Sequence, residues 1–264
     1  MGGLRWKIIS FLYSLFNYDP NTKLKLRHLK NPETIGTEYG SWVIPKNFLN
    51  KNSICYLVGA GEDISFDVGV AEKYGSKVFV FDPTPKAIQH FKEFEKCILK
   101  NEKMSINNSS SEFYNLNKET LALLHFYELG LWKEETVMKF YSPKNPEHAS
   151  YSISNIQKTE NYIEARVDRL SSIMKKLRHS SIDLLKLDID GAEYDVLRSI
   201  IEDRLDVKVI CVEYDEPHFS PGHNTLSRIV GSLKSLMALG YVIADASKFC
   251  NYTLVRKDVY EQLN

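Results

Sequence analysis

Groups of acidic and glycine residues stand at the ends of four apolar runs that are typical of buried strands. They occupy residues 59–63, 82–85, 188–193 and 213–218. In an open parallel sheet, ligands bind outside the carboxyl ends of the strands, near the point where the strand order reverses. We therefore expect these groups, although far apart in the chain, to meet at one edge of a sheet and to form a single site.

The first group supplies a glycine-rich turn with two carboxylates. Gly59 and Gly61 form a G-x-G pair, which by itself is a weak signal. A nicotinamide or flavin dinucleotide site would carry a third glycine where Ile64 stands. Glu62 and Asp63 would also repel a pyrophosphate at the N-terminus of the next helix. They favour instead a cationic ligand without phosphate, and S-adenosylmethionine, which carries a sulfonium and an ammonium group, meets that description.

The second group provides a carboxylate for a sugar. Asp82 lies 21 positions after Gly61, at the end of the second expected strand, where an acidic side chain can accept hydrogen bonds from both ribose hydroxyls. A structural alternative stays open. In that alternative Glu62 and Asp63 only favour the dipole of the next helix, and Asp82 caps a turn.

Alternating apolar runs and helical patterns predict the elements that position these groups. From residue 53 onward the sequence has the βα alternation of a parallel sheet covered by helices. The expected strands are 53–59, 77–82, part of 121–132, 162–168, 182–189 and 207–215. An edge strand or hairpin is also expected at 136–142, and a closing antiparallel pair after residue 240. The expected helices are 63–75, 86–100, 170–179, 193–203 and 224–240.

Three segments resemble a known family. VGAGEDISFD (58–67), VFVFDPTP (78–85) and LLKLDIDGAEYDVL (184–197) are similar to the FkbM-type S-adenosylmethionine-dependent methyltransferases. The resemblance spans about residues 53–256 and depends mainly on the K-x-D-x-[DE]-G-A-E block. It implies an α/β class I methyltransferase (Rossmann-like) fold, with a doubly wound seven-stranded sheet that is mostly parallel and has an antiparallel last strand. It also implies methylation of an oxygen, often on a sugar, a glycan or another small metabolite.

The cofactor contacts that the resemblance implies lie in loops at the ends of strands. Residues 59–63 would surround the methionine end of S-adenosylmethionine and Asp82 its ribose, while Leu129 would offer apolar surface beside the adenine. Asp190 departs from the family, which more often has glutamate there. The full expected set is Gly59, Ala60, Gly61, Glu62, Asp63, Asp82, Pro83, Thr84, Glu128, Leu129 and Asp188.

A hydroxyl acceptor must lose its proton during methyl transfer, so a general base within hydrogen-bond reach is expected. The candidates are Asp188, Asp190, Glu193, Glu213 and His218. Asp188 is our first choice, because it ends a strand directly at the expected switch point. Glu193 would alternatively cap the following helix, whose first turn suits an acidic residue. His218 belongs to the residue type whose unperturbed pKa is nearest to neutrality.

No metal is expected at this site. Several carboxylates could hold a divalent cation, but Lys186, two residues before Asp188 on the same strand face, would already neutralise part of their charge. The four cysteines lie far apart and form no C-x-x-C pair, which disfavours zinc. Cys55 and Cys211 fall in apolar runs, as reduced buried thiols do, and this favours a reducing, cytoplasmic location.

The longest stretch without periodicity, residues 142–161, is a candidate to cover the acceptor. With the neighbouring Tyr141, it offers His148, Tyr151 and Asn155 to a sugar. An ordinary exposed loop would have the same composition, so both interpretations stay open.

The overall composition excludes several classes of protein. Among 264 residues, 34 Lys and Arg balance 34 Asp and Glu, so the formal net charge is zero. Neutrality and the lack of a basic, aromatic-interleaved patch argue against a nucleic-acid methyltransferase. We expect a small-molecule or glycan acceptor. The alternative is a catalytically inactive S-adenosylmethionine-binding or interaction module with the same fold.

Residues 1–50 are expected to form a helical extension, and residues 51–264 the methyltransferase domain. The stretch 6–16 is mostly apolar but too short for a transmembrane helix, which needs about 20 apolar residues. An amphipathic helix packed on the body is the simplest interpretation. Peripheral membrane contact, helped by nearby basic residues, and a shortened signal or anchor segment stay open.

Overall fold

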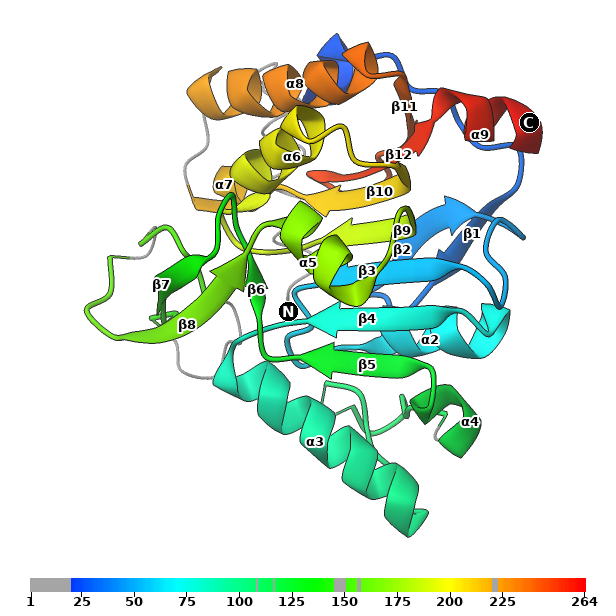
Figure 1. Ribbon diagram of the computed structural model, residues 1–264, viewed down its shortest axis with the longest axis vertical. Coiled ribbons are helices and arrows are strands. Elements are labelled where there is room, and N and C mark those ends of the chain that lie inside the picture. Colours follow the sequence, from blue (N-terminus) through cyan, green and yellow to red (C-terminus); the bar gives the residue numbers. More distant parts are fainter. Residues whose placement is uncertain (1–19, 108, 116, 145–150, 156–157, 220–222) are drawn as a thin grey trace.

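A seven-stranded sheet lies at the centre of the computed structural model, which describes residues 20–107, 109–115, 117–144, 151–155, 158–219 and 223–264. The strand order is β11-β12-β10-β9-β3-β4-β5 (Figure 1). The strands are β3 (Ile54–Val58), β4 (Lys77–Phe81), β5 (Leu124–Tyr127), β9 (Ile182–Leu187), β10 (Val207–Glu213), β11 (Tyr241–Asp245) and β12 (Asn251–Arg256).

Neighbouring strands of this sheet are parallel except at β12, which runs antiparallel to both β10 and β11. The inner strands β3, β9 and β10 are buried along most of their length, as their near-continuous apolar sequences require. The chain passes from β3 to β4 and β5 and later returns to β9 on the other side of β3, so the strand order switches between β3 and β9. The predicted fold class is confirmed, including the antiparallel last strand.

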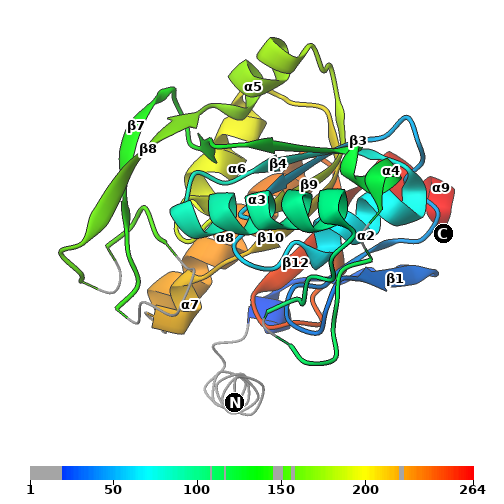
Figure 2. The same cartoon turned by 90° about the horizontal axis from the view of Figure 1, so that it is seen from below.

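Helices cover both faces of the sheet (Figures 1 and 2). One apolar core packs under α2 (Ser65–Tyr74), α3 (Pro85–Lys100), α4 (Lys118–Leu121) and α9 (Lys257–Leu263). The other packs under α5 (Leu170–Leu177), α6 (Glu193–Glu202) and α8 (His223–Ala238). Gly75 ends α2 with a left-handed φ of 64°, and Pro85 begins α3. The sequence predicted the long helices but not α9.

The described part of the first 50 residues consists of a 3-10 helix, η1 (Pro20–Lys23), and an antiparallel hairpin of β1 (Pro32–Ile35) and β2 (Trp42–Pro45). Ile35, Trp42 and Ile44 are buried in the same core as α2 and α3. A Cβ on Gly69 of α2 would lie 2.4 Å from the Ile35 side chain, so the hairpin is packed closely against this helix.

Residues 32–45 therefore form a hairpin where a helical extension was expected, because Trp42 and Ile44 bury their side chains in that core. The expected helix at 6–16 lies outside the described residues, and the domain division at residue 50 stays a prediction. Within the part of the chain that the structure describes, no helix has both the length and the apolar character needed to cross a bilayer.

A small second sheet stands beside the main one. It consists of β6 (Gly130–Leu131), β8 (Tyr162–Asp168) and β7 (Thr136–Tyr141), in that order, and β7 and β8 extend away from the body as a ribbon (Figure 2). The ribbon lies on the side toward which β4 and β5 point, as does α7 (Glu216–Phe219) (Figure 1). The sequence predicted β7 and β8 but not that β8 leaves the main sheet, and it did not predict α7.

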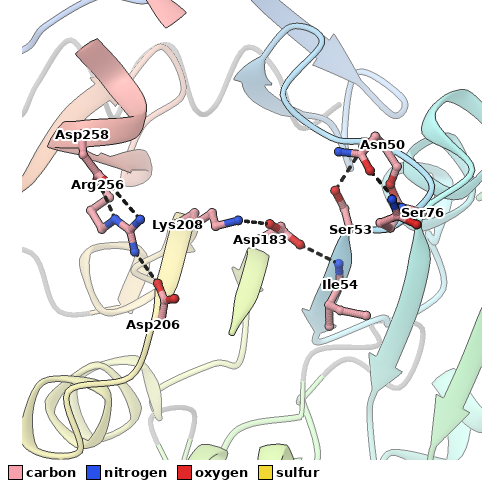
Figure 3. A network of polar contacts seen from close by, with 10 residues as sticks. Asn50, Ser53, Ile54, Ser76, Asp183, Asp206, Lys208, Arg256 and Asp258 are labelled. Atoms are coloured by element: carbon pink, nitrogen blue, oxygen red, sulfur yellow. Dashed lines mark hydrogen bonds and ion pairs between the residues drawn. The ribbon is translucent and has the colours of Figure 1, made fainter. Parts of the chain in front are cut away.

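At the opposite edge, which we call the amino-terminal rim, polar side chains tie the starts of the strands together (Figure 3). Asp183 of β9 accepts hydrogen bonds from Nζ of Lys208 on β10 at 2.7 Å and from the N–H of Ile54 on β3 at 2.8 Å. Arg256 of β12 is paired with both Asp206 and Asp258. Each of these carboxylates therefore forms an ion pair with a basic side chain.

Candidate active site at the carboxyl ends of the strands

The carboxyl ends of five strands are level with one another. Val58 of β3 pairs with Phe81 of β4 and with Leu187 of β9. Phe81 in turn pairs with Tyr127 of β5, and Leu187 with Val212 of β10. The residues that follow these paired positions form one end of the sheet, which we call the carboxyl-terminal rim: Gly59, Asp82, Glu128, Asp188 and Glu213, the last of which still belongs to β10.

The glycine loop after β3 passes directly over the end of β9. Gly59 has a φ of +82°, and a Cβ on it would lie 1.7 Å from the carbonyl oxygen of Asp188, so the approach requires glycine. Gly61 has a φ of +53°, but a Cβ there would meet no atom within 4 Å. The space in front of Gly61 is therefore open to a ligand at the switch point of the strand order.

Asp82 holds this loop in place. Its Oδ2 accepts hydrogen bonds from the N–H groups of Ala60 and Gly61 at 2.9 and 3.0 Å. Its Oδ1 accepts from the N–H and the hydroxyl of Thr84 at 2.8 and 2.6 Å, and Asp82 is only 5% exposed. In the structure Asp82 thus acts as the turn-capping alternative describes, and its contact with a ribose stays a prediction.

The two carboxylates of the glycine loop have different surroundings. Oδ2 of Asp63 accepts hydrogen bonds from the hydroxyl of Thr37 at 2.6 Å and from the side-chain amide of Asn107 at 2.8 Å. The side chain of Glu62 is 44% exposed, and its ion pair with Lys86 is long, at 3.7 Å. Glu62 is therefore the more accessible of the two to a cationic ligand.

A buried lysine connects the glycine loop to Asp188. Nζ of Lys186 lies 3.1 Å from Oδ2 of Asp188 and also donates a hydrogen bond to the carbonyl of Gly59. Burial lowers the pKa of Lys186, but the attraction of Asp188 and Asp67 outweighs it, so the net change is upward. Lys186 therefore stays an ammonium and fixes Asp188 beside the loop.

Asp67 of α2 is the second carboxylate that acts on Lys186. It is 2% exposed, and its Oδ1 has no hydrogen-bond partner within the described structure. Burial raises the pKa of Asp67 to about 6, although the charge of Lys186 offsets part of the increase. The sequence analysis missed this residue, because a single aspartate in the first turn of a helix is ordinarily a solvent-exposed favourable charge.

Three further carboxyl groups of the rim have no ion pair in the described part of the chain. Desolvation raises the pKa of Asp190 and of Asp215 well above the ordinary value, and the negative charge of Asp188 adds to the rise for Asp190, as that of Asp190 does for Asp215. Oδ2 of Asp215 is buried without a hydrogen-bond partner there. Both oxygens of Glu193 accept from the N–H of Gly191, at 2.9 and 3.1 Å, and burial raises the pKa of Glu193 to about 7. Glu193, only 1% exposed, thus caps this turn.

Asp188 is the rim carboxylate that borders both the glycine loop and open space. Its side chain is 36% exposed, and desolvation raises its pKa although Lys186 opposes the change. Glu213, at the end of β10, accepts a hydrogen bond from the amide of Asn251 at 3.1 Å. His218 lies in α7, but its side chain is outside the described part of the structure.

The turn after β5 lies next to the Asp82 loop. The N–H of Asp82 donates to the carbonyl of Tyr127 at 3.1 Å. Pro83 also reaches this turn, since a Cβ on Gly130 would lie 3.4 Å from its ring. Leu129 is partly buried in the second core, whereas Glu128 points to solvent and is 58% exposed. Of Glu128 and Leu129, both members of the expected cofactor set, Leu129 is the one that offers an apolar surface.

Part of the segment 142–161 docks on the turn after β9. The hydroxyl of Ser152 donates to the carbonyl of Asp190 at 2.5 Å, and a Cβ on Gly191 would lie 3.0 Å from Oγ of Ser154. The described part of this segment therefore borders the carboxyl-terminal rim. His148 is outside the described residues.

The turn between β1 and β2 forms another wall of the rim, and the sequence analysis missed it. Thr37 donates its N–H to Oγ of Ser65 at 2.9 Å and its hydroxyl to Asp63. The only signal in the sequence was the pair of glycines Gly36 and Gly40, because the strand before them, Pro32–Ile35, has no apolar pattern of its own.

A family model identifies the fold that carries this site. Residues 56–243 match the model of the methyltransferase FkbM domain. The chain belongs to this family. Its cofactor is accordingly S-adenosylmethionine, and this membership agrees with the resemblance of the K-x-D-x-[DE]-G-A-E block.

The residues of the rim fit S-adenosylmethionine. The space in front of Gly61 is open, and a buried oxygen of Asp215 has no partner in the described structure. Carboxylates around such a space favour the sulfonium and ammonium groups of the cofactor. Among the described residues, no group of three or more His, Cys, Asp or Glu could hold a metal ion.

Solved structures resemble this FkbM-family chain at low identity. The METTL16 methyltransferase domain has a TM-score of 0.39 and 10% identity over 77% of this chain, which spans 59% of the METTL16 structure. The fibrillarin pre-rRNA processing protein of Methanococcus jannaschii has a TM-score of 0.37 and 9% identity, covering 89% of this chain and 86% of its own. TYW2 of M. jannaschii, in complex with AdoMet, has a TM-score of 0.31 and 13% identity, with coverage of 88% and 87%. These scores are too low to support a function, and no curated protein matches the sequence.

Proposed function

We propose that this chain transfers the methyl group of S-adenosylmethionine to a hydroxyl of a sugar, a glycan or another small metabolite. The supporting observation is the position of Asp188. This carboxylate stands at the switch point, directly below the glycine loop, and Lys186 fixes it there at 3.1 Å. When bound, S-adenosylmethionine supplies an electrophilic methyl group, so the protein has to align the acceptor and take up its proton.

Asp188 is our candidate for the general base that takes up this proton. The pKa of Asp188 is raised, and is therefore nearer to neutral pH than that of an ordinary aspartate. A general base works best when its pKa is close to the working pH. The other candidates are less suited to meet an acceptor. Glu193 is buried in its cap, and Asp190 lies against Asp215 in a turn with a φ of +41°.

A small acceptor suits the surroundings of the rim. The described parts of the segment 142–161 and of the β1–β2 turn both border it, so loops from two directions stand around the open space. The chain has no net charge, which gives no reason to expect a polyanionic partner. A cytoplasmic location, and membrane contact through residues 6–16, stay parts of this proposal that rest on the sequence.

The test combines binding with methyl transfer. Calorimetry should detect binding of S-adenosylmethionine by the full chain. Label from the tritiated cofactor should then appear on members of a panel of sugars, nucleotide sugars, glycans and phenols, with RNA and DNA assayed beside them. Asp188→Asn should reduce the transfer rate at least about 100-fold, with cofactor affinity changed less than about threefold. Asp183→Asn, at the amino-terminal rim, is the matched control and should leave the transfer rate unchanged.

Each other outcome has a defined meaning. A chain that does not bind S-adenosylmethionine contradicts the proposal, and transfer to RNA or DNA alone contradicts the acceptor class. Binding without transfer to any member of the panel favours the catalytically inactive binding module. Full activity of Asp188→Asn removes Asp188 as the base while leaving the reaction in place.

A further inference from the structure

The turn between β1 and β2 is held by a lysine from the other end of the chain. Nζ of Lys248, in the connection between β11 and β12, donates hydrogen bonds to the carbonyl oxygens of Glu38, Tyr39 and Ser41 at 3.0, 3.1 and 2.8 Å. An ammonium group has three N–H donors, so this contact uses all of them. The backbone of residues 38–41 is therefore fixed.

The same turn is pressed against the glycine loop. The N–H of Gly40 donates to Oγ1 of Thr37 at 3.0 Å, and the Thr37 hydroxyl donates to Asp63 at 2.6 Å. A Cβ on Gly40 would lie 2.8 Å from the carboxylate of Asp63, so a side chain here would displace that carboxylate. The turn thus stands where the methionine end of the cofactor is expected.

Tyr39 is exposed although its backbone is fixed. It is 80% exposed, more than any other large apolar or aromatic residue in the described part of the chain. Its pKa is nevertheless raised, first by desolvation and then by the charges of Asp188, Glu213 and other rim carboxylates. The exposed fraction measures the surface that is free for contact, and by this measure the ring is available to a ligand. The turn that carries the ring contacts Asp63 of the glycine loop, so the ring stands beside the acidic rim.

Exposed aromatic rings beside carboxylates favour one kind of ligand group, an organic cation. The face of a tyrosine ring attracts cations, and the attraction is stronger where water is excluded. We propose that Tyr39 covers the sulfonium end of bound S-adenosylmethionine, so that the site prefers the charged methyl donor to the product, whose sulfur is neutral. Lys248 is the positioning residue that presents the ring. The inference deepens the proposed function, because it uses the same cofactor site.

Calorimetry with the cofactor and with S-adenosylhomocysteine tests this inference without an acceptor. The quantity to compare is the ratio of the two Kd values in the wild type, Tyr39→Phe, Tyr39→Leu and Tyr39→Ala. Phe keeps the aromatic face, whereas Leu keeps only apolar area. The preference for S-adenosylmethionine should fall about three- to tenfold in the Leu and Ala variants and stay within about twofold in Tyr39→Phe.

Lys248→Arg tests the positioning. Arginine keeps the charge, but its planar guanidinium cannot donate to three convergent carbonyls. We expect the same ratio to fall, by less than in Tyr39→Ala, and amide hydrogen exchange at residues 37–41 to become faster. Faster exchange with an unchanged ratio would show that Lys248 does not position the ring for the cofactor.

The failures of the two proposals are distinguishable. If the wild-type chain binds neither compound, the proposed function fails and the inference with it. If the wild type binds both and Tyr39→Ala leaves the ratio unchanged, or weakens both compounds equally, the contact with the sulfonium is wrong and the proposed function stands.

Discussion

The two rims of the sheet contain similar residues in opposite electrostatic arrangements. At the amino-terminal rim, Asp183 is paired with Lys208, and Asp206 and Asp258 share Arg256 (Figure 3). At the carboxyl-terminal rim, Asp188, Asp190, Glu193, Glu213 and Asp215 gather around the single buried cation Lys186, counted within the described residues. A chain with no net charge thus places an excess of negative charge at one edge.

This difference indicates what each rim does. Paired carboxylates at the amino-terminal rim stabilise the fold. At the other rim desolvation raises the pKa values of Asp188, Asp190 and Asp215, which means that the ionised groups are held at a cost to stability. Such a cost is typical of sites that bind a ligand or do chemistry, and a cationic cofactor would offset it. Substitutions at the two rims should therefore have different consequences.

The largest expected effect is that of Gly59→Ala. The new Cβ would overlap the Asp188 carbonyl, at 1.7 Å, so the glycine loop would have to move. We expect calorimetry to give at least about 100-fold weaker binding of S-adenosylmethionine, equivalent to about 3 kcal/mol.

Gly75→Ala is the matched control. Gly75 also has a positive φ, but a Cβ there would lie 3.7 Å from its nearest neighbour. That variant should lose only about 1 kcal/mol of stability and keep its affinity. Equal affinities of the two variants would contradict the comparison.

Asp82→Asn should have the next largest effect. The carboxylate accepts four hydrogen bonds from the two loops, and an amide NH2 group cannot accept those at its own position. Urea unfolding should give a loss of about 2–3 kcal/mol, and cofactor affinity should fall with it. If stability fell and affinity did not, the glycine loop would not be the cofactor site.

Asp67→Asn tests the cost of the unpaired charge through pH. The pKa of Asp67 is about 6 in the folded state, above its value in the unfolded chain, so the folded state binds more protons between about pH 4 and 6. Stability from this group therefore falls as pH rises through that interval. The variant should be more stable than the wild type by about 2 kcal/mol at pH 8 and about equal to it near pH 4. Urea unfolding at both pH values measures this, and a variant that is less stable at pH 8 would contradict it.

The smallest effect is expected at the amino-terminal rim. Asp183→Asn removes the ion pair with Lys208 but leaves an oxygen that can accept from the N–H of Ile54. Thermal and urea unfolding should give a loss of about 1 kcal/mol, with binding of S-adenosylmethionine unchanged within about twofold. A large change in affinity would mean that the two rims are not functionally separate.

Much of the fold could be predicted from the sequence, because the signals are local. Apolar runs of strand length, Gly75 after a helix and Pro85 at the start of one are read directly from residue types. The hairpin of β1 and β2 was not predicted, since its strands are four residues each and are stabilised by α2 rather than by their own pattern. The roles of Asp82 and Glu193 could not be chosen from the sequence either, because a carboxylate that caps a turn and one that contacts a ligand have the same residue type.

The sequence by itself determined the family. It also determined which acidic and glycine residues follow each strand, and that such residues suit S-adenosylmethionine. Only the tertiary structure decided which carboxylates already have hydrogen-bond partners within the protein, because partners such as Thr37 and Asp63 are far apart in the chain. It also decided that Lys248 and Tyr39, 209 residues apart, are joined by a hydrogen bond. The type of a residue determines which interactions its side chain can make. Long-range packing determines which of these the protein makes itself and which are left for a ligand.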